Sequence, residues 1–245
     1  MTAKLLTEFI GTFFLVLTIG LTVLIGSTFA PFAIAGILMA MIYMGGHVSG
    51  AHYNPAVTLA VWLRGKLPAV EVVPYVLAQL AGAILAAYAA DIVTGDVLRV
   101  VPAEETGLGA FFLLELLFTF ALALVILHVA TATATAGNSY YGLAIGLVVL
   151  AGALAAGPIS GGAFNPAVAL GPYFALCRDG FYRGSGFRRL VGAGSVQRFY
   201  DSAGHCLAWR GGDLSVCQTV YRLAAILPRS CILLGRTCGL GSGVW

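Results

Sequence analysis

The sequence predicts an all-α membrane protein, an inverted repeat of transmembrane helices around two half-helix loops, in which a sixth spanning helix is missing. Three observations carry this prediction. Of the 245 residues, 60% are hydrophobic and only 9% are charged, and the mean hydropathy is +0.95, whereas about a quarter of a soluble domain is charged. Five apolar runs are long enough to cross a bilayer. The tripeptide Asn-Pro-Ala occurs twice, each time at the head of a shorter apolar run.

The five long runs are predicted to be transmembrane helices, because a span needs about 20 mostly apolar residues. They cover residues 5–25, 29–46, 70–90, 110–130 and 140–156. The run after each Asn-Pro-Ala, residues 57–63 and 168–176, has only about ten residues, so as a helix it reaches about half way across a bilayer. These two runs are predicted to be half-helices.

Each half-helix is predicted to begin at the proline of its motif. The motif residues are Asn54, Pro55 and Ala56 in the first copy and Asn165, Pro166 and Ala167 in the second. Proline fits the first turn of a helix, where its missing N–H costs nothing, and asparagine fits the N-cap. Two such helices that meet at mid-membrane would bring two positive dipole ends and two amides together, an arrangement suited to a pore for neutral solutes.

The two halves of the chain repeat each other. Glu8 and Glu115 stand in matching apolar runs 107 residues apart, and the two motifs are 111 residues apart. Three spans separate the glutamates, so the two copies enter the membrane from opposite sides, as in an inverted repeat. The halves cover about residues 1–108 and 109–176, and the second is truncated.

The basic residues predict the orientation. Lys4, Arg64 and Lys66 fall on one side of the membrane, and the acidic loop 91–109 falls on the other. By the positive-inside rule, the protein is predicted to be a multi-pass cell-membrane protein with a cytoplasmic N-terminus.

With both motifs preceded by Ser-Gly-(Ala/Gly)-x-x and followed by a half-span, residues 1–176 resemble the major intrinsic protein family, the aquaporins and glycerol facilitators. The resemblance implies a passive channel for water and small neutral solutes, not an enzyme, with no metal and no cofactor. It also implies a homotetramer in the lipid bilayer, with one pore in each protomer. Nothing in the composition suggests a nucleic-acid partner.

The resemblance also implies roles for single residues. The amides of Asn54 and Asn165 would donate hydrogen bonds to passing solutes. Glu8 and Glu115 would brace the half-helix loops by accepting backbone N–H bonds, which we favour over a proton relay. His47 and His52 match the family pattern His-x-Ser-Gly-x-His and would support the cytoplasmic vestibule, which we favour over a pH gate.

The outer constriction departs from the family pattern. The four corresponding positions are Ile34, Ala153, Gly162 and Val168. Family members usually carry Arg at the position of Val168, and glycerol facilitators usually carry Asp at the position of Ala169. The ring is therefore predicted to be wide and apolar, without a fixed cation, and to pass neutral solutes somewhat larger than water.

Residues 177–245 differ sharply from the rest. They contain nine Arg, no Lys and all five Cys, with a net charge of +6 against −3 before them, and they lack a run of spanning length. An out-of-frame end of the coding sequence fits this abrupt change best. A disordered extension or a genuine extramembrane domain stays open. A zinc or disulfide module is favoured least, because no Cys-x-x-Cys pair occurs.

Two functional alternatives also stay open. Without a sixth span the protein could be a non-conducting or defective family member. An ion-coupled secondary transporter shares inverted repeats and broken helices, but it would need a coupling-ion site at mid-membrane, for which the sequence offers only the two glutamates.

Overall fold

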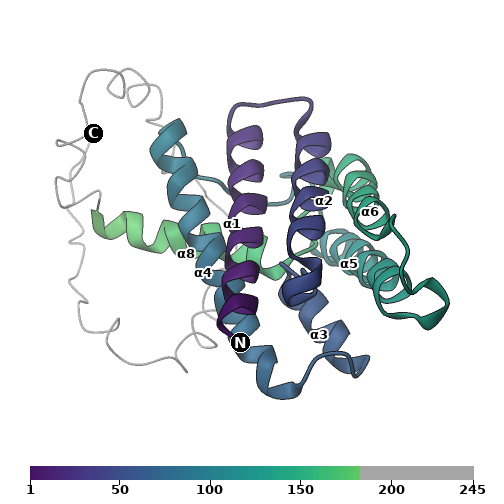
Figure 1. The fold of residues 1–245 in the computed structure, drawn as a ribbon. Coiled ribbons are helices and arrows are strands. Elements are labelled where there is room, and N and C mark those ends of the chain that lie inside the picture. The colour runs from purple at the N-terminus through teal and green to yellow at the C-terminus, as the bar shows by residue number, and fades with distance from the viewer. Residues whose placement is uncertain (183–245) are drawn as a thin grey trace, which may run out of the picture. The chain divides into compact units, whose positions relative to one another are not determined.

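The computed structural model describes residues 1–182, which are helical throughout their regular structure (Figure 1). The elements are α1 (Thr2–Leu24), α2 (Ala30–Ser49), α3 (Pro55–Leu63), α4 (Ala69–Thr94), α5 (Leu108–Thr131), the 3-10 turn η1 (Thr133–Thr135), α6 (Tyr141–Ala155), α7 (Gly157–Ser160) and α8 (Pro166–Tyr182). The predicted all-α class is confirmed. The expectations for residues 183–245, including the missing sixth helix, lie outside the described residues.

Four of the five predicted spans are helices long and apolar enough to cross a membrane: α1, α2, α4 and α5, of 20 to 26 residues. The fifth predicted span, residues 140–156, corresponds to α6 and is shorter than predicted. Helix α6 has only 15 residues, which makes it about 22 Å long. Pro158, in the following helix α7, lacks an N–H, and its ring would collide with the carbonyl four residues before it. The proline thus explains why the regular helix stops short of it.

The two half-helices begin at Pro55 and Pro166, as predicted. Helix α3 has nine residues, in agreement with a half-span. Helix α8 has 17 residues and continues to Tyr182, beyond the predicted end at residue 176. That end was predicted from the change of composition after residue 176. The backbone hydrogen bonds that define a helix do not depend on such a change.

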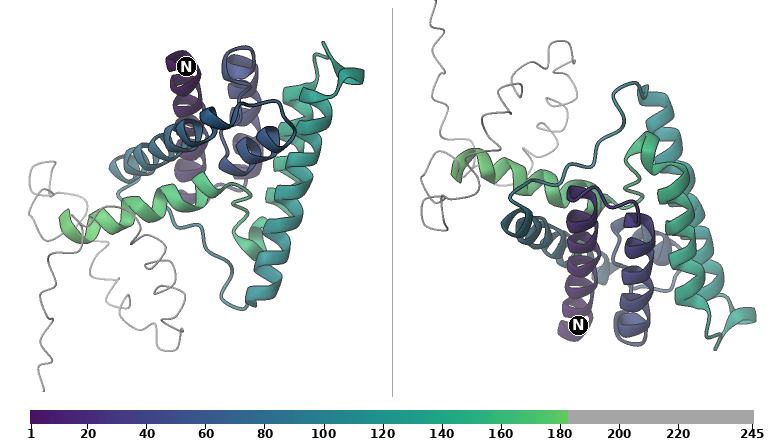
Figure 2. Two further views of the ribbon diagram at one scale, coloured as in Figure 1. Left: turned by 90° about the horizontal axis from the view of Figure 1, so that it is seen from below. Right: turned by 90° about the horizontal axis from the view of Figure 1, so that it is seen from above.

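Close packing of α1 on α4 holds the first half together (Figures 1 and 2). A Cβ on Gly82 would lie 2.4 Å from the carbonyl oxygen of Phe9, and a Cβ on Gly20 would lie 2.7 Å from the Cβ of Ala90. Only small residues at these points let the two backbones approach so closely, which is how helices associate in membranes. Helix α2 lies between α1 and the α5–α6 pair.

The basic residues of the first half gather at one end of the bundle. The N-terminus and the α3–α4 connection lie at the same end in Figure 1; Lys4 belongs to the first turn of α1, and Arg64 and Lys66 belong to the connection. The Lys4 ammonium forms an ion pair with Glu71 there, at 3.0 Å. The connection between α1 and α2 lies at the opposite end.

Replacement of Gly11 by alanine is expected to destabilise the protein. A Cβ at this position would lie 2.1 Å from Cε1 of Tyr53, whose ring is fully buried and whose hydroxyl donates a hydrogen bond to the Met41 carbonyl at 2.8 Å. Overpacking of this kind costs about 1–3 kcal/mol. Thermal unfolding of the full chain in detergent should show a lowered midpoint for Gly11→Ala.

The matched control is Gly36→Ala, since Gly36 is an exposed helical residue and a Cβ added to it would have no neighbour within 4 Å. Alanine there should leave the midpoint unchanged or raise it slightly, by up to about 1 kcal/mol of stability. Equal unfolding midpoints for the two variants would contradict the close packing of the Tyr53 ring against Gly11.

Candidate functional site

Two loops, residues 50–54 between α2 and α3 and residues 161–165 between α7 and α8, share one pattern of positive φ angles. Three positions in each loop adopt positive φ, at equivalent places 111 residues apart: Gly50 and Gly161 (91° and 88°), Ala51 and Gly162 (53° and 64°), Tyr53 and Phe164 (50° and 45°). Non-glycine residues rarely adopt this region, so their presence here indicates backbone held by its surroundings.

Glu8 of α1 holds the first loop. Its side chain is fully buried and accepts four hydrogen bonds. Oε1 accepts from the Ser49 hydroxyl at 2.7 Å and the His52 N–H at 2.9 Å. Oε2 accepts from the Tyr53 N–H at 2.7 Å and the Gln79 amide at 2.8 Å. Each carboxylate oxygen therefore has two donors, which compensates for burying the group away from water.

Glu115 of α5 has the matching position beside the second loop. Oε1 accepts from the Ser160 hydroxyl at 2.7 Å and the Ala163 N–H at 3.2 Å, and Oε2 accepts from the Phe164 N–H at 2.7 Å. No counterpart of Gln79 donates to Glu115 within residues 1–182, and this carboxylate is only half-buried. The two glutamates thus make equivalent contacts, but the second makes one fewer.

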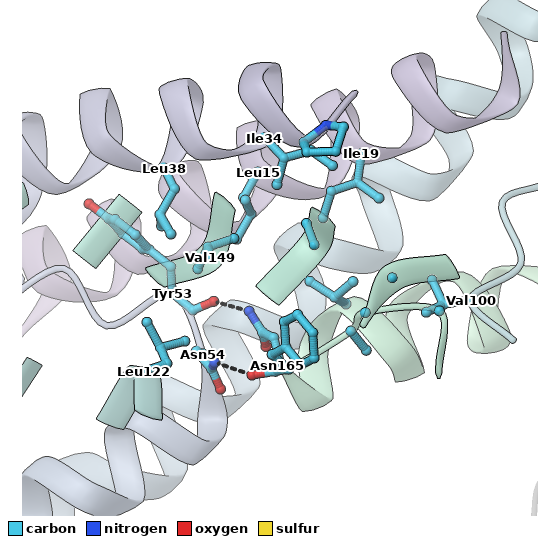
Figure 3. Close-up of a pocket in the computed structure, with 18 of the residues that line it drawn as sticks. Leu15, Ile19, Ile34, Leu38, Tyr53, Asn54, Val100, Leu122, Val149 and Asn165 are labelled. Carbon is cyan, nitrogen blue, oxygen red and sulfur yellow. Dashed lines mark hydrogen bonds between the residues drawn. The ribbon is translucent and has the colours of Figure 1, made fainter. Parts of the chain in front are cut away.

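The side chain of each motif asparagine forms a hydrogen bond to the opposite loop (Figure 3). The Asn54 amide nitrogen donates to the Phe164 carbonyl, and the Asn165 amide nitrogen donates to the Tyr53 carbonyl, both at 2.9 Å. Each amide oxygen accepts the backbone N–H two residues further on, at 2.8 and 2.9 Å. An amide nitrogen carries two hydrogens, so each asparagine keeps one N–H that these bonds do not use.

Both asparagines line a cavity of about 390 Å³. Its walls are mainly apolar, with Leu15, Leu38, Leu122 and Val149 around the asparagines in Figure 3. The four predicted constriction residues line this same cavity: Ile34 from α2, Ala153 from α6, Gly162 from the second loop and Val168 from α8. The structure therefore brings together the two motifs and the predicted ring at one continuous space.

The two predicted support histidines have different surroundings. His52 is buried and lines the cavity, with its Nδ1 3.2 Å from the Thr58 hydroxyl and its ring 5.3 Å from that of Tyr75. Thr58 also accepts a hydrogen bond from Gln79 at 2.9 Å, so His52 belongs to the network around Glu8. His47, in the last turn of α2, is exposed and lies outside the cavity lining.

One wall of the cavity was not expected from the sequence. Four consecutive residues of the α4–α5 connection line it, Leu98 to Val101, and among the lining residues Arg99 is the only one with a permanent charge. The sequence alone marks this connection only as an acidic loop. Irregular segments have no periodicity, so nothing in the local pattern points to the cavity.

Comparisons with known proteins agree with one another. The family description "Major intrinsic protein" matches residues 1–184, eight residues beyond the resemblance found in the sequence. The chain is 34% identical over 190 residues to the probable aquaporin NIP4-2 of Arabidopsis thaliana, covering 73% of this chain and 66% of the relative. It is 35% identical over 182 residues to nodulin-26 of Glycine max, covering 70% and 66%.

A solved structure is also similar, the aquaglyceroporin from Plasmodium falciparum. The TM-score is 0.63 at 25% identity, over 74% of this chain and 82% of that one. The matched part of the chain spans slightly less than two thirds of the length of the two curated relatives.

Replacement of Glu8 by glutamine should destabilise the protein more than the same replacement of Glu115. An amide group in place of the carboxylate would point an NH₂ at donors of the first loop, and lost hydrogen bonds to a buried charge cost about 3 kcal/mol or more in total. Glu115→Gln should cost about half as much, because Glu115 has three donors and is half-buried. Unfolding midpoints of the two full-length variants in the same detergent test this order, which equal losses would contradict.

Proposed function

This chain belongs to the major intrinsic protein family, and we propose that it is a passive channel for water and small neutral solutes across the cell membrane. The crossed pair of asparagines in an apolar-walled cavity is the observation that carries the proposal. The relative from Arabidopsis thaliana is named a probable aquaporin and the similar solved structure is an aquaglyceroporin, which supports the same function.

The proposed path runs past the two amides. Each asparagine has one N–H left to donate to the oxygen of a passing water or hydroxyl group. The N-terminal ends of α3 and α8 begin directly after these asparagines, so their positive dipole ends act at the same point. Donors of this kind attract oxygen atoms, and the positive potential opposes the passage of protons and cations.

The proposed selectivity follows from the ring of Ile34, Ala153, Gly162 and Val168. None of these side chains can donate a hydrogen bond, and two of them are glycine or alanine, so the ring presents little bulk and no charge. We infer weaker discrimination in favour of water and passage of somewhat larger neutral solutes. Because Ala169 stands where glycerol facilitators usually carry Asp, a standard glycerol site is not part of the proposal.

We propose that the N-terminus lies on the cytoplasmic side of the membrane and that four copies of the chain form a homotetramer. The cluster of Lys4, Arg64 and Lys66 at one end supports this orientation through the positive-inside rule. Helix α5 exposes large apolar side chains, among them Phe112, Leu116 and Phe120, which suit contact with lipid or with another copy of the chain. Measurement of the oligomer mass in detergent would test the tetramer.

Osmotic shrinkage of proteoliposomes that contain the full chain tests the channel. We expect faster shrinkage than in protein-free liposomes, with a low activation energy and no need for an ion gradient. Shrinkage at the rate and activation energy of bare lipid would support the non-conducting alternative. Solute uptake that requires a sodium or proton gradient would support the ion-coupled alternative.

A bulky side chain at Ala153 should narrow the ring. Ala153→Phe is expected to lower urea and glycerol permeability by about tenfold and to reduce water permeability less, because larger solutes depend more on pore width. The control is Leu154→Phe at the neighbouring residue, which is half exposed and outside the cavity lining. If wild-type proteoliposomes already exclude every solute larger than water, the wide-ring interpretation is wrong.

A further inference from the structure

We propose that Arg99 supplies the fixed positive charge at the mouth of the pore that Val168 cannot provide, and that it excludes small cations while donating hydrogen bonds to oxygen-bearing neutral solutes. This inference rests on the proposed channel function. It concerns a residue of the α4–α5 connection, a different segment from the half-helix that carries Val168.

The position of Arg99 supports this role. Leu98 and Val97 before it are buried, at 1% and 8% exposure, whereas Arg99 itself is exposed. Arg99 nevertheless lines the same cavity as Val168 and the two asparagines. Val100, its neighbour, lies in Figure 3 on the side of Asn165 away from Leu38. Buried neighbours thus hold the backbone directly before an exposed arginine that belongs to the cavity lining.

The connection is also fastened to α7, the short helix that directly precedes the second loop. The Ala103 N–H and the Thr106 hydroxyl both donate to the Ile159 carbonyl, at 3.0 and 2.9 Å. The Val101 carbonyl lies so close to Gly161 that a Cβ there would come within 2.7 Å of its oxygen. Arg99 therefore belongs to a segment held at a defined place beside the loop that carries Gly162.

Within residues 1–182, Arg99 forms no ion pair with a carboxylate. The ion pair found in this part of the chain joins Lys4 and Glu71 at the far end of α1. The nearest acid in sequence, Asp96, directs one carboxylate oxygen at the Val97 N–H, at 2.7 Å. An arginine keeps its charge at all physiological pH values and carries five N–H donors. Because Arg99 is exposed, water and salt screen its field, which therefore acts mainly within the cavity that the residue lines.

A series of substitutions at Arg99 tests the charge. Proteoliposomes with the full chain are assayed in parallel for water flux, by osmotic shrinkage, and for methylammonium uptake. We expect Arg99→Gln to raise methylammonium permeability by about tenfold and Arg99→Glu to raise it further, while Arg99→Lys stays near wild type. Arg64→Gln is the matched control, because Arg64 is an exposed arginine outside the cavity lining.

A second variant separates charge from structure. Val168→Arg in the Arg99→Gln background returns a cation to the same cavity, and it should restore exclusion of methylammonium. If Arg99→Gln loosened the loop instead, this addition would not restore it, and the inference would be overturned.

The two proposals fail in different ways. Equal methylammonium uptake in wild type, Arg99→Gln and Arg99→Glu, together with wild-type water flux above that of bare lipid, overturns the role of Arg99 alone. Wild-type water flux equal to that of bare lipid overturns the channel function and, with it, the inference that rests on it.

Discussion

The need to satisfy backbone N–H groups away from water governs this structure. The hydrocarbon of a bilayer offers no hydrogen-bond partners to a non-helical segment, so the N–H groups of such a loop that do not face a water-filled cavity must find partners within the protein. The two glutamates meet this need: each accepts hydrogen bonds from two consecutive N–H groups of its loop and from the hydroxyl of the serine at the end of the preceding helix. A carboxylate accepts several donors at once and holds them more strongly than a neutral group. This is a physical reason to place a charge inside a span, where it is otherwise expensive.

The crossed asparagines depend on that bracing. Tyr53 and Phe164 adopt positive φ, and the carbonyl of each accepts the asparagine amide of the opposite loop at 2.9 Å. The strain of these conformations is tolerated because the adjacent N–H groups are bound by the glutamates. The hydrogen bonds of each asparagine to the opposite loop and to its own helix fix the orientation of its amide group. The remaining N–H of each asparagine is therefore oriented by the fold and not by the solute.

The sequence was informative wherever a residue pattern has a direct physical meaning. Long apolar runs predicted α1, α2, α4 and α5, and proline predicted where α3 and α8 begin, because its missing N–H is tolerated at a first helical turn. The predicted end of α8 was wrong, because composition does not decide where the backbone hydrogen bonds of a helix stop. The meeting of the two asparagines was predicted, but the carbonyl that each amide binds and the place of Arg99 at the cavity were not, because both depend on contacts between segments far apart in the chain.

The two loops are alike in backbone but not in support. Glu8 is fully buried and receives a fourth bond from Gln79, whereas Glu115 is half-buried and receives three bonds from the described residues. The second loop region has an additional support that is not helical, the α4–α5 connection, which donates twice to Ile159. Because that connection also carries Arg99, the stability of the second loop and the charge at the mouth are linked through one short segment. A sequence change there would alter both, although the segment belongs to neither Asn-Pro-Ala motif.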